Sequence, residues 1–168
     1  MSVGGQPVEE VPVVQTERLE LVGKTRDETR AYLETMPPEY RKEVSPEWLA
    51  RLEASANIDP WVHGFAIRHR GSGVVIGTGG YTGPPDANGE VEIAYAIDEE
   101  HQGKGYATEA AGALVNFAYN HPAVRLVRAH TLPVANASTR VLTKCGFQKA
   151  GEIIDPNDGP VWRWVKPK

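Results

Sequence analysis

A glycine-rich turn in the middle of this chain has the residues needed to bind an anion. It reads Gln102-Gly103-Lys104-Gly105-Tyr106-Ala107 and lies between an alternating strand, 90–97, and an apolar helix, 105–119. The first backbone N–H groups of a helix have no partner within the helix, and its N-terminus carries about half a positive charge. Glycine allows a close approach because it has no Cβ atom. The turn therefore predicts a site for phosphate groups.

Three kinds of phosphate-binding turn can be compared with this one. The nucleoside-triphosphate loop requires a glycine where the chain has Asp98 and a serine or threonine where it has Gly105. The dinucleotide fingerprint fits Gly103 and Gly105, but its third position is Thr108 and the next strand, 124–131, carries no acid. A turn of the form Gln/Arg-x-x-Gly-x-Gly/Ala fits at all of its defined positions. A glycine-rich turn without a ligand is the alternative.

The third form is typical of the GNAT superfamily of N-acetyltransferases, where the turn cradles the pyrophosphate of acetyl-CoA. From Thr16 to Trp164 the chain resembles the branch that includes the ribosomal-protein alanine N-acetyltransferases. Several motifs in the same order make this resemblance more specific than the turn alone. Beside the turn they are Thr16-Glu17-Arg18-Leu19, Val75-Ile76-Gly77-Thr78-Gly79-Gly80, Glu92-Ile93-Ala94-Tyr95, Ala107-Thr108-Glu109-Ala110, Ala137-Ser138-Thr139-Arg140-Val141-Leu142 and Lys144-Cys145-Gly146-Phe147.

The resemblance implies where acetyl-CoA binds. The strand before the turn and the strand after its helix would splay apart, and the pantetheine arm would pair with exposed backbone near Ala96 and Ile97. The pyrophosphate would meet the N–H groups of the turn, and each charge-assisted hydrogen bond contributes roughly 1.5–3 kcal/mol. Lys104 adds a nearby cation or is a solvated surface lysine. The expected cofactor residues of the turn are Gln102, Gly103, Lys104, Gly105, Tyr106, Ala107 and Thr108.

Acetyl transfer requires a neutral amine and a route for its proton. At pH 7 a chain α-amine with a pKa of about 7.7–8.0 is roughly one-tenth neutral, whereas a lysine amine near 10.4 is neutral in under about one part in a thousand. Glu92, on the strand that reaches the splay, is the candidate base, acting directly or through water. The alternative is a carboxylate that only attracts the ammonium group. His101 and His130 flank the same gap, and either could relay a proton.

Two positions depart from the family's common pattern. Many members carry a tyrosine, as general acid, five residues before the Phe of the Gly-Phe pair, and this chain has Leu142 there. The resemblance implies that Ser138, one helical turn earlier, protonates the leaving thiolate, and a plain N-cap is the alternative. Ala135 replaces the usual asparagine that contacts the cofactor. Asn136 is the candidate to take over this contact.

Two functions stay open at this point. The first is an acetyl-CoA-dependent N-acetyltransferase that acts by direct attack in a ternary complex on a primary amine, either a protein N-terminus or a small molecule. The second, motivated by Leu142 and Ala135, is a non-catalytic module that binds acyl-CoA. Segment 27–60 is expected to form one wall of the acceptor site, and its mixed charges identify no acceptor. Glu109 is expected to complement the dipole of the helix that it opens.

Composition sets further limits. The 168 residues carry a formal net charge of −4, which gives no support for binding nucleic acid or a lipid surface. A single cysteine, Cys145, excludes an intramolecular disulfide and is compatible with the cytoplasm, the expected location. No stretch approaches the roughly 20 apolar residues of a membrane span, and no signal-peptide pattern opens the chain. The five histidines lack metal-site spacing, so we expect no metal, and we expect a monomer or homodimer.

Periodicity predicts an α/β (α+β) fold with a mixed sheet. The resemblance implies the GNAT form of it: about seven mostly antiparallel strands, helices on both faces and a splay between the fourth and fifth strands. Residues 1–15 are expected to be a flexible N-terminal arm and 16–168 a single domain. The expected strands are 18–22, 64–69, 74–81, 90–97, 125–131, 147–153 and 161–165. The expected helices are 27–36, one capped by Ser45, 105–119 and 138–144.

Overall fold

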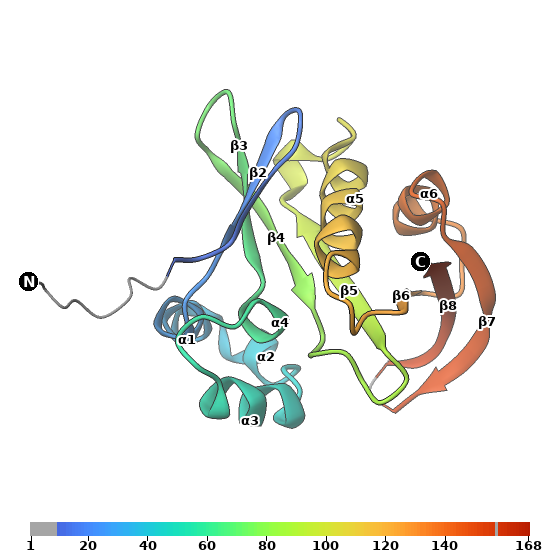
Figure 1. Ribbon diagram of the computed structural model, residues 1–168, viewed down its shortest axis with the longest axis horizontal. Helices are drawn as coiled ribbons and strands as arrows, with labels where there is room; N and C mark the ends of the chain where they lie inside the picture. The colour runs from blue at the N-terminus through green and yellow to red at the C-terminus, as the bar shows by residue number, and fades with distance from the viewer. Residues whose placement is uncertain (1–9, 157) are drawn as a thin grey trace, which may run out of the picture.

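The computed structural model describes residues 10–156 and 158–168 (Figure 1). Its strands are β1 Val13–Gln15, β2 Leu19–Gly23, β3 Phe65–His69, β4 Val75–Tyr81, β5 Glu90–Ile97, β6 Leu126–Thr131, β7 Gln148–Asp155 and β8 Gly159–Pro167. Its α-helices are α1 Arg26–Thr35, α2 Pro38–Arg41, α3 Pro46–Ala54, α4 Pro60–His63, α5 Tyr106–Tyr119 and α6 Ala137–Lys144, with a short 3-10 helix, η1, at Glu99–His101. None of the helices in this described part combines the length and hydrophobicity that crossing a bilayer requires.

One sheet contains all of these strands, in the order β1-β2-β3-β4-β5-β6-β8-β7. Neighbouring strands are antiparallel except β5 and β6, which are parallel, so the predicted mixed, mostly antiparallel sheet is confirmed. The sheet has one strand more than expected because Val13–Gln15 form β1 and pair with β2. The expectation of a flexible arm was therefore wrong for these residues. The first part of that arm, 1–9, lies outside the described residues.

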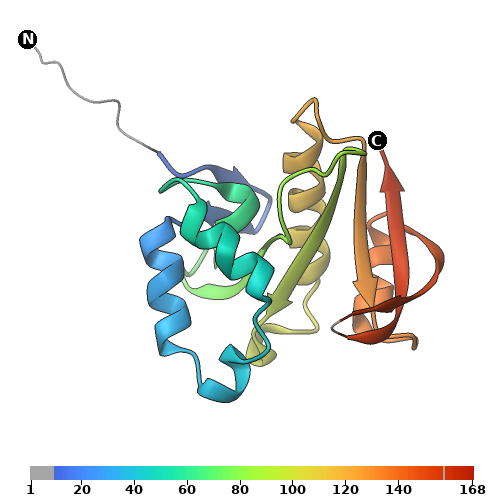
Figure 2. The ribbon, with the colours of Figure 1, turned by 90° about the horizontal axis from the view of Figure 1, so that it is seen from below.

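The sheet opens between β5 and β6. These strands pair over Glu90–Glu92 and Leu126–Arg128. Beyond that point β5 continues along β4 and β6 continues along β8. Figure 2 shows β5, in yellow-green, and β6, in orange, diverging from the ends where they pair. The predicted splay is confirmed, and it is bordered by residues 93–97 and 129–131.

Helix α5 packs on one face of the sheet. Its buried side includes Ala110, Ala111 and Ala118, whose small side chains let the helix lie close to the strands. The hydroxyl of Tyr81 in β4 donates to the carbonyl of Leu114 at 2.6 Å and ties sheet and helix together. The fully buried side chains around this contact include Leu19, Leu21, Phe65, Ile67, Val115 and Val127.

Short helices cover the opposite face of the sheet. Ser45 caps α3 as predicted, since its hydroxyl accepts from the N–H of Trp48, and Pro46 follows in the first turn. Helix α4, capped by Asp59, is an addition to the predicted elements because four residues are too few to show a helical period. Helices therefore lie on both faces, as expected.

Buried His63 joins α3 to α4. Its Nε2 lies 2.9 Å from the hydroxyl of Ser55, which donates to the carbonyl of Leu52, and its Nδ1 accepts from the N–H of Asp59 at 3.2 Å. These partners require the neutral ring with the proton on Nε2. Burial lowers the pKa of His63 below its usual value, and neighbouring Arg26 acts in the same direction.

This lowered pKa predicts a loss of stability in mild acid. Because the folded state holds His63 neutral, its contribution is fully present above about pH 6.5, the usual histidine pKa, and is lost as the pH falls through the lower folded value. Denaturant unfolding of the wild type should therefore show a decline between pH 7 and 5 that His63→Gln lacks. His69→Gln, at the last residue of β3, is the control and should keep the wild-type slope.

Candidate active site

The glycine turn leads from η1 into α5, and its backbone is open to a ligand. Gly103 and Gly105 have φ angles of 78° and 84°, a region that side chains other than glycine rarely adopt. Among the described residues, no acceptor is found for the N–H groups of 103–108. A Cβ at Gly103 would have no heavy atom within 4 Å. The turn is therefore a row of unpaired donors at a helix N-terminus, with open space in front of Gly103.

The side chain of Gln102 makes a hydrogen bond within the protein. Its Nε2 donates to the carbonyl of Ile97 at 2.8 Å and so fixes the turn to the end of β5. Lys104 is exposed, as a cation beside a phosphate or a solvated lysine would be. The ring of Tyr106 faces β2 and β3, where it lies 5.6 Å from the ring of His69. Only the backbone of Tyr106 is thus placed toward the predicted pyrophosphate.

Arg18 and Glu109 hold the turn in place, which sequence reasoning missed. The guanidinium of Arg18 bonds the carboxylate of Glu109 at 2.8 Å and donates to the carbonyl of Lys104 at 2.9 Å. It also lies 4.5 Å from the centre of the Tyr106 ring. Glu109 accepts further from the Thr16 hydroxyl and from the N–H of Arg18. The carboxylate expected only to complement the helix dipole therefore ties α5 and the turn to the bend that precedes β2.

Glu109→Gln is expected to destabilise the protein by about 1–3 kcal/mol at pH 7, since a partly buried charged acceptor loses its donors. Burial opposes ionisation, but the bonds from Thr16 and Arg18 lower the pKa of Glu109 overall. Its stabilising effect is thus present above the unfolded carboxyl pKa and is lost as the pH falls through the folded value. Denaturant unfolding should show the difference between wild type and variant shrinking below about pH 4.

Glu99→Gln, an exposed carboxylate in η1, is the matched control and should change stability by less than about 0.5 kcal/mol at either pH. A Glu109→Gln difference that is independent of pH would contradict the assigned ion pair.

The open edge of β5 differs in detail from the expectation. The N–H of Thr82 donates to the carbonyl of Glu92, and the N–H of Asp98 donates to that of Ile76. Alternation along the antiparallel pair then directs the backbone of Ala96 toward β4, where Ala96 pairs with Thr78. The backbone groups that face the splay belong to Ile93, Tyr95 and Ile97, and the carbonyl of Ile97 already accepts from Gln102. The backbone of Ala96, the expected contact, therefore bonds β4, and that of its neighbour Tyr95 faces the splay.

Glu92 lies in a charged cluster where β5 and β6 part. Its Oε1 is 2.9 Å from Nδ1 of His130 and 3.4 Å from Nε of Arg128. Arg128 also reaches Glu90 at 3.2 Å, and Glu90 is 2.6 Å from Arg163 in β8. Burial opposes the charge of Arg128, but Glu90 and Glu92 raise its pKa overall. The candidate base thus accepts from Arg128 and lies within ion-pair distance of His130, both on the neighbouring strand.

The two histidines of the predicted gap have different surroundings. His101 is a surface residue of η1, 3.6 Å from Glu100. His130 is in β6, two residues beyond the last pairing with β5, and its side chain is 18% exposed. The structure brings His130 together with Glu92, and it leaves His101 outside this cluster. Within the described residues no group of His, Cys, Asp and Glu side chains is arranged to hold a metal ion.

The residues at the start of helix α6 have other roles than expected. Asn136 is the N-cap: its side chain accepts from the N–H of Thr139, whose hydroxyl accepts from the N–H of Asn136. The amide oxygen expected to contact the cofactor is therefore used in capping. Ser138 is exposed in the first helical turn and is not the cap. Leu142 is 1% exposed and belongs to the core.

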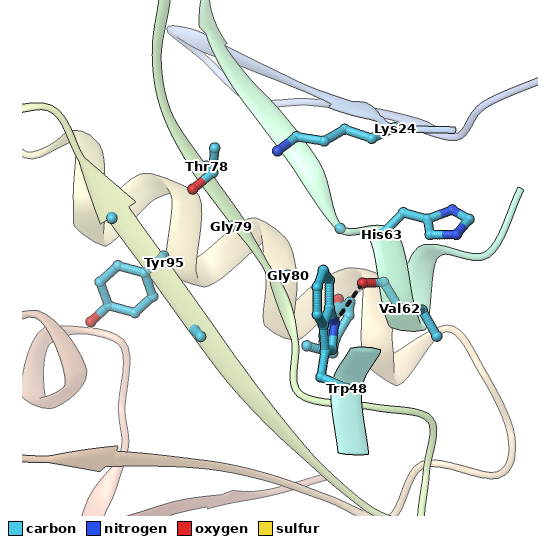
Figure 3. A pocket seen from close by; sticks show the side chains of 12 residues that line it. Lys24, Trp48, Val62, His63, Thr78, Gly79, Gly80 and Tyr95 are labelled. Carbon is cyan, nitrogen blue, oxygen red and sulfur yellow. Dashed lines mark hydrogen bonds between the residues drawn. The ribbon is translucent and has the colours of Figure 1, made fainter. Parts of the chain in front are cut away.

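Two side chains near α6 stay protonated. Burial raises the pKa of the Cys145 thiol, whose Sγ lies 3.4 Å from the carbonyl of Thr108. This agrees with a packing role and not with a reactive thiolate. Burial also raises the pKa of Tyr95, with a smaller effect from Cys145. Figure 3 shows the Tyr95 ring pointing away from Lys24 and Trp48, on the other side of β5. Tyr95 is a phenol that sequence reasoning missed.

A cavity of about 320 Å³ lies on the face of the sheet opposite α5 (Figure 3). Trp48 forms one wall and donates from its indole nitrogen to the carbonyl of Val62 at 3.1 Å. Lys24 points toward Thr78, and burial lowers the pKa of this lysine. Trp48 thus lines a pocket, whereas Trp61 packs edge-on against Tyr81 at 4.8 Å.

A second cavity, of about 540 Å³, adjoins the first and shares Trp48 and Tyr81 with it. It reaches Glu92 and Arg128 at the start of the splay, and α3 contributes Ser45 and Arg51. Six carboxyl groups and two arginines line it, so acidic groups predominate. The carboxyl groups are those of Glu47, Asp86, Glu90, Glu92, Asp155 and Asp158. The two cavities lie where segment 27–60 was expected to form the acceptor wall.

Comparison with known families decides what this arrangement is. The family model described as "Acetyltransferase (GNAT) domain" matches residues 13–148. The chain belongs to the GNAT family. The match covers β1 to the start of β7 and therefore includes the glycine turn, the splay and α6.

Curated relatives are also acetyltransferases by name. The uncharacterized N-acetyltransferase YjdG of Bacillus subtilis is 30% identical over 119 residues, which are 71% of this chain and 66% of YjdG. An aminoglycoside N(6')-acetyltransferase type 1 of Klebsiella pneumoniae is 28% identical over 131 residues, 75% of this chain and 65% of that protein. The GNAT chain thus spans slightly less than two thirds of the length of these relatives.

Solved structures share the fold at lower identity. A GNAT acetyltransferase of Bacillus anthracis superposes with a TM-score of 0.67 at 18% identity, covering 93% of this chain and 98% of the other. RimL, a ribosomal L7/L12 α-N-protein acetyltransferase in complex with coenzyme A, gives 0.68 at 16%, covering 93% and 98%. The aminoglycoside acetyltransferase AAC(6')-Ib in complex with coenzyme A and kanamycin gives 0.64 at 20%, covering 89% and 95%.

Proposed function

We propose that this GNAT protein transfers the acetyl group of acetyl-CoA to a primary amine by direct attack in a ternary complex. The observation that carries the proposal is the open edge of β5, which leads from the splay directly to the unpaired N–H groups of 103–108. An extended pantetheine arm fits such an edge because it can pair as an added strand. A pyrophosphate fits the turn because a helix N-terminus attracts anions.

The acceptor enters from the opposite face of the sheet. The two cavities reach the splay at Tyr95 and at Glu92, so an amine there meets a thioester held between β5 and β6. The predominance of carboxyl groups in the larger cavity favours a protonated amine as the approaching group. Glu92 contributes its carboxylate to this approach or to removal of the ammonium proton, and Ser138 returns a proton to the departing thiolate.

Two kinds of similarity support two different classes of acceptor. The ribosomal-protein alanine branch that the sequence motifs resemble supports a protein N-terminus. The match to an aminoglycoside N(6')-acetyltransferase supports a small-molecule amine. A panel of N-terminal peptides, aminoglycosides, polyamines and amino acids separates the two classes. The proposal includes a cytoplasmic location and a monomer or homodimer.

Release of free CoA thiol tests the proposal. The purified protein is expected to bind acetyl-CoA by calorimetry and to release thiol above the hydrolysis background with at least one amine of the panel. Mass spectrometry of the acceptor should show the added acetyl group. Binding without thiol release across the whole panel would support the non-catalytic acyl-CoA module instead, and absence of binding would contradict both.

A further inference from the structure

His130 and Glu92 form a pair that no similarity assigns. Nδ1 of His130 lies 2.9 Å from Oε1 of Glu92 across the point where β5 and β6 separate. Resting on the proposed acetyl transfer, we propose that His130 is the general base, taking the proton of the acceptor ammonium on Nε2, and that Glu92 is a positioning residue that orients the imidazole. This reverses the roles expected from the sequence, where Glu92 is the base and His130 a possible relay.

Glu92 is poorly arranged to accept a proton from the substrate. Its Oε1 already faces two donors, Nδ1 of His130 and Nε of Arg128. A carboxylate oxygen that lies between two such nitrogens is well placed to hold the imidazole in position. The geometry therefore gives Glu92 the part of the orienting carboxylate in a carboxylate–imidazole pair.

His130 has the complementary arrangement. Nδ1 lies 2.9 Å from a carboxylate oxygen, which offers only lone pairs, so we infer that the neutral ring carries its proton on Nδ1 and leaves the lone pair on Nε2. Among the residues that the structure describes, no partner of Nε2 is found. An imidazole can take up a proton on one ring nitrogen while the other faces a carboxylate, which suits a general base. Strand alternation places His130 on the same face of the sheet as Glu92 and Arg128, which line the larger cavity.

The proposed proton transfers balance. Nε2 of His130 takes one proton from the acceptor ammonium, and the imidazolium is stabilised by the carboxylate of Glu92. The neutral amine attacks the thioester carbonyl, the C–N bond forms and the C–S bond breaks. The Ser138 hydroxyl, the proposed donor, protonates the thiolate, and the second proton released from the nitrogen restores this hydroxyl. His130 then returns its proton to solvent.

The charged groups around His130 come from three strands. Glu92 and Glu90 lie on β5, Arg128 is in β6 beside His130, and Arg163 in β8 is its register partner. The two carboxylates favour the imidazolium, whereas the two arginines oppose it. Arg128 and Arg163 both bond Glu90, and Glu92 is the carboxylate that lies 2.9 Å from the ring.

His130→Gln should distinguish a base from a structural histidine. Glutamine still donates to Glu92 but cannot take the proton. With a lysine-like amine at pH 7 we expect kcat/KM to fall by about 10²–10⁴-fold, and acetyl-CoA affinity to stay unchanged. The loss should shrink toward pH 10, where the amine is neutral without help, and should be much smaller for an α-amine of lower pKa. A structural defect would lower kcat/KM by the same factor for all acceptors and at all pH values.

Matched variants complete the test. His101→Gln removes the other histidine, also beside a glutamate, and should leave kcat/KM unchanged. Glu92→Gln should cost less than His130→Gln, and the double variant should lose no more than His130→Gln alone because the pair acts as a unit. Loss of turnover in Glu92→Gln with near wild-type turnover in His130→Gln would overturn the proposal and make Glu92 the base.

The tautomer gives a readout without any acceptor. Long-range ¹⁵N–¹H spectra of the free protein should show His130 protonated on Nδ1 near neutral pH, and Glu92→Gln should shift this tautomer equilibrium. A ring protonated on Nε2 would overturn the proposal even in an active enzyme. Conversely, a wild type that shows the Nδ1 tautomer but no thiol release with any amine would overturn the proposed function, not the pairing of His130 with Glu92.

Discussion

Gly103→Ala is expected to weaken acetyl-CoA binding by about 10- to 100-fold while the protein stays folded. The φ angle of 78° is unfavourable for alanine, so the turn must shift and its N–H groups lose their common direction. In addition, the new methyl group would project into the open space where the pyrophosphate approaches. Loss of a single charge-assisted hydrogen bond, about 1.5–3 kcal/mol, already corresponds to this range. Calorimetric titration with acetyl-CoA measures it.

The chain provides a closely matched control in Gly73, in the turn between β3 and β4. Its φ angle is 74°, and a Cβ there would also have no heavy atom within 4 Å. Both alanine variants should therefore lose a similar stability, about 1–2 kcal/mol, from the left-handed backbone. Only Gly103→Ala should lose affinity. Equal affinities of the two variants would show that the turn does not bind the pyrophosphate.

Leu142→Tyr is expected to destabilise the protein by about 2–6 kcal/mol and to give no gain in turnover. Leu142 is 1% exposed in the core, so a larger ring costs about 1–3 kcal/mol in overpacking and its buried hydroxyl a similar amount. The tyrosine that many GNAT members carry at this position would thus find no room beside the present core. Denaturant unfolding and thiol release measure the two effects.

Arg140→Tyr places the same side chain on the exposed face of α6 and should be nearly neutral. Ser138→Ala and Tyr95→Phe then identify the hydroxyl that protonates the thiolate: the first should slow turnover, and the second should do so only if the buried phenol has taken over this task. A stable and faster Leu142→Tyr would instead show that the position still accepts a general acid.

Local patterns predicted the parts of the site that lie within one segment. The glycines of the turn, the apolar face of α5 and the alternation of β5 are adjacent in sequence, and their arrangement follows from backbone geometry alone. The splay required the resemblance to a family, because nothing within β5 or β6 shows where their pairing ends. The same holds for helices on both faces of the sheet.

Contacts between residues far apart in the sequence could not be predicted from local patterns. Arg18 and Glu109 are 91 positions apart, and each lies in an ordinary local setting, in the bend before β2 and in a first helical turn. The partners of Glu92 depend on the parallel register of β5 and β6, which a shift of one residue would change. The N-cap considered from the sequence was Ser138, two positions beyond the actual cap Asn136, because both Asn and Ser cap helices well. The capping box with Thr139 was the available signal.

The short pairing between β5 and β6 makes the protein a body of two half-sheets, β1 to β5 and β6 to β8, joined by a narrow seam. A cofactor lying in the opening would bridge the two halves and lengthen this seam. The free energy of cofactor binding would then also stabilise the association of the two halves, by about 2.7 kcal/mol at a ligand concentration one hundred times Kd. Acetyl-CoA would in this way be a temporary structural strand, and its departure as CoA would return the halves to their looser connection.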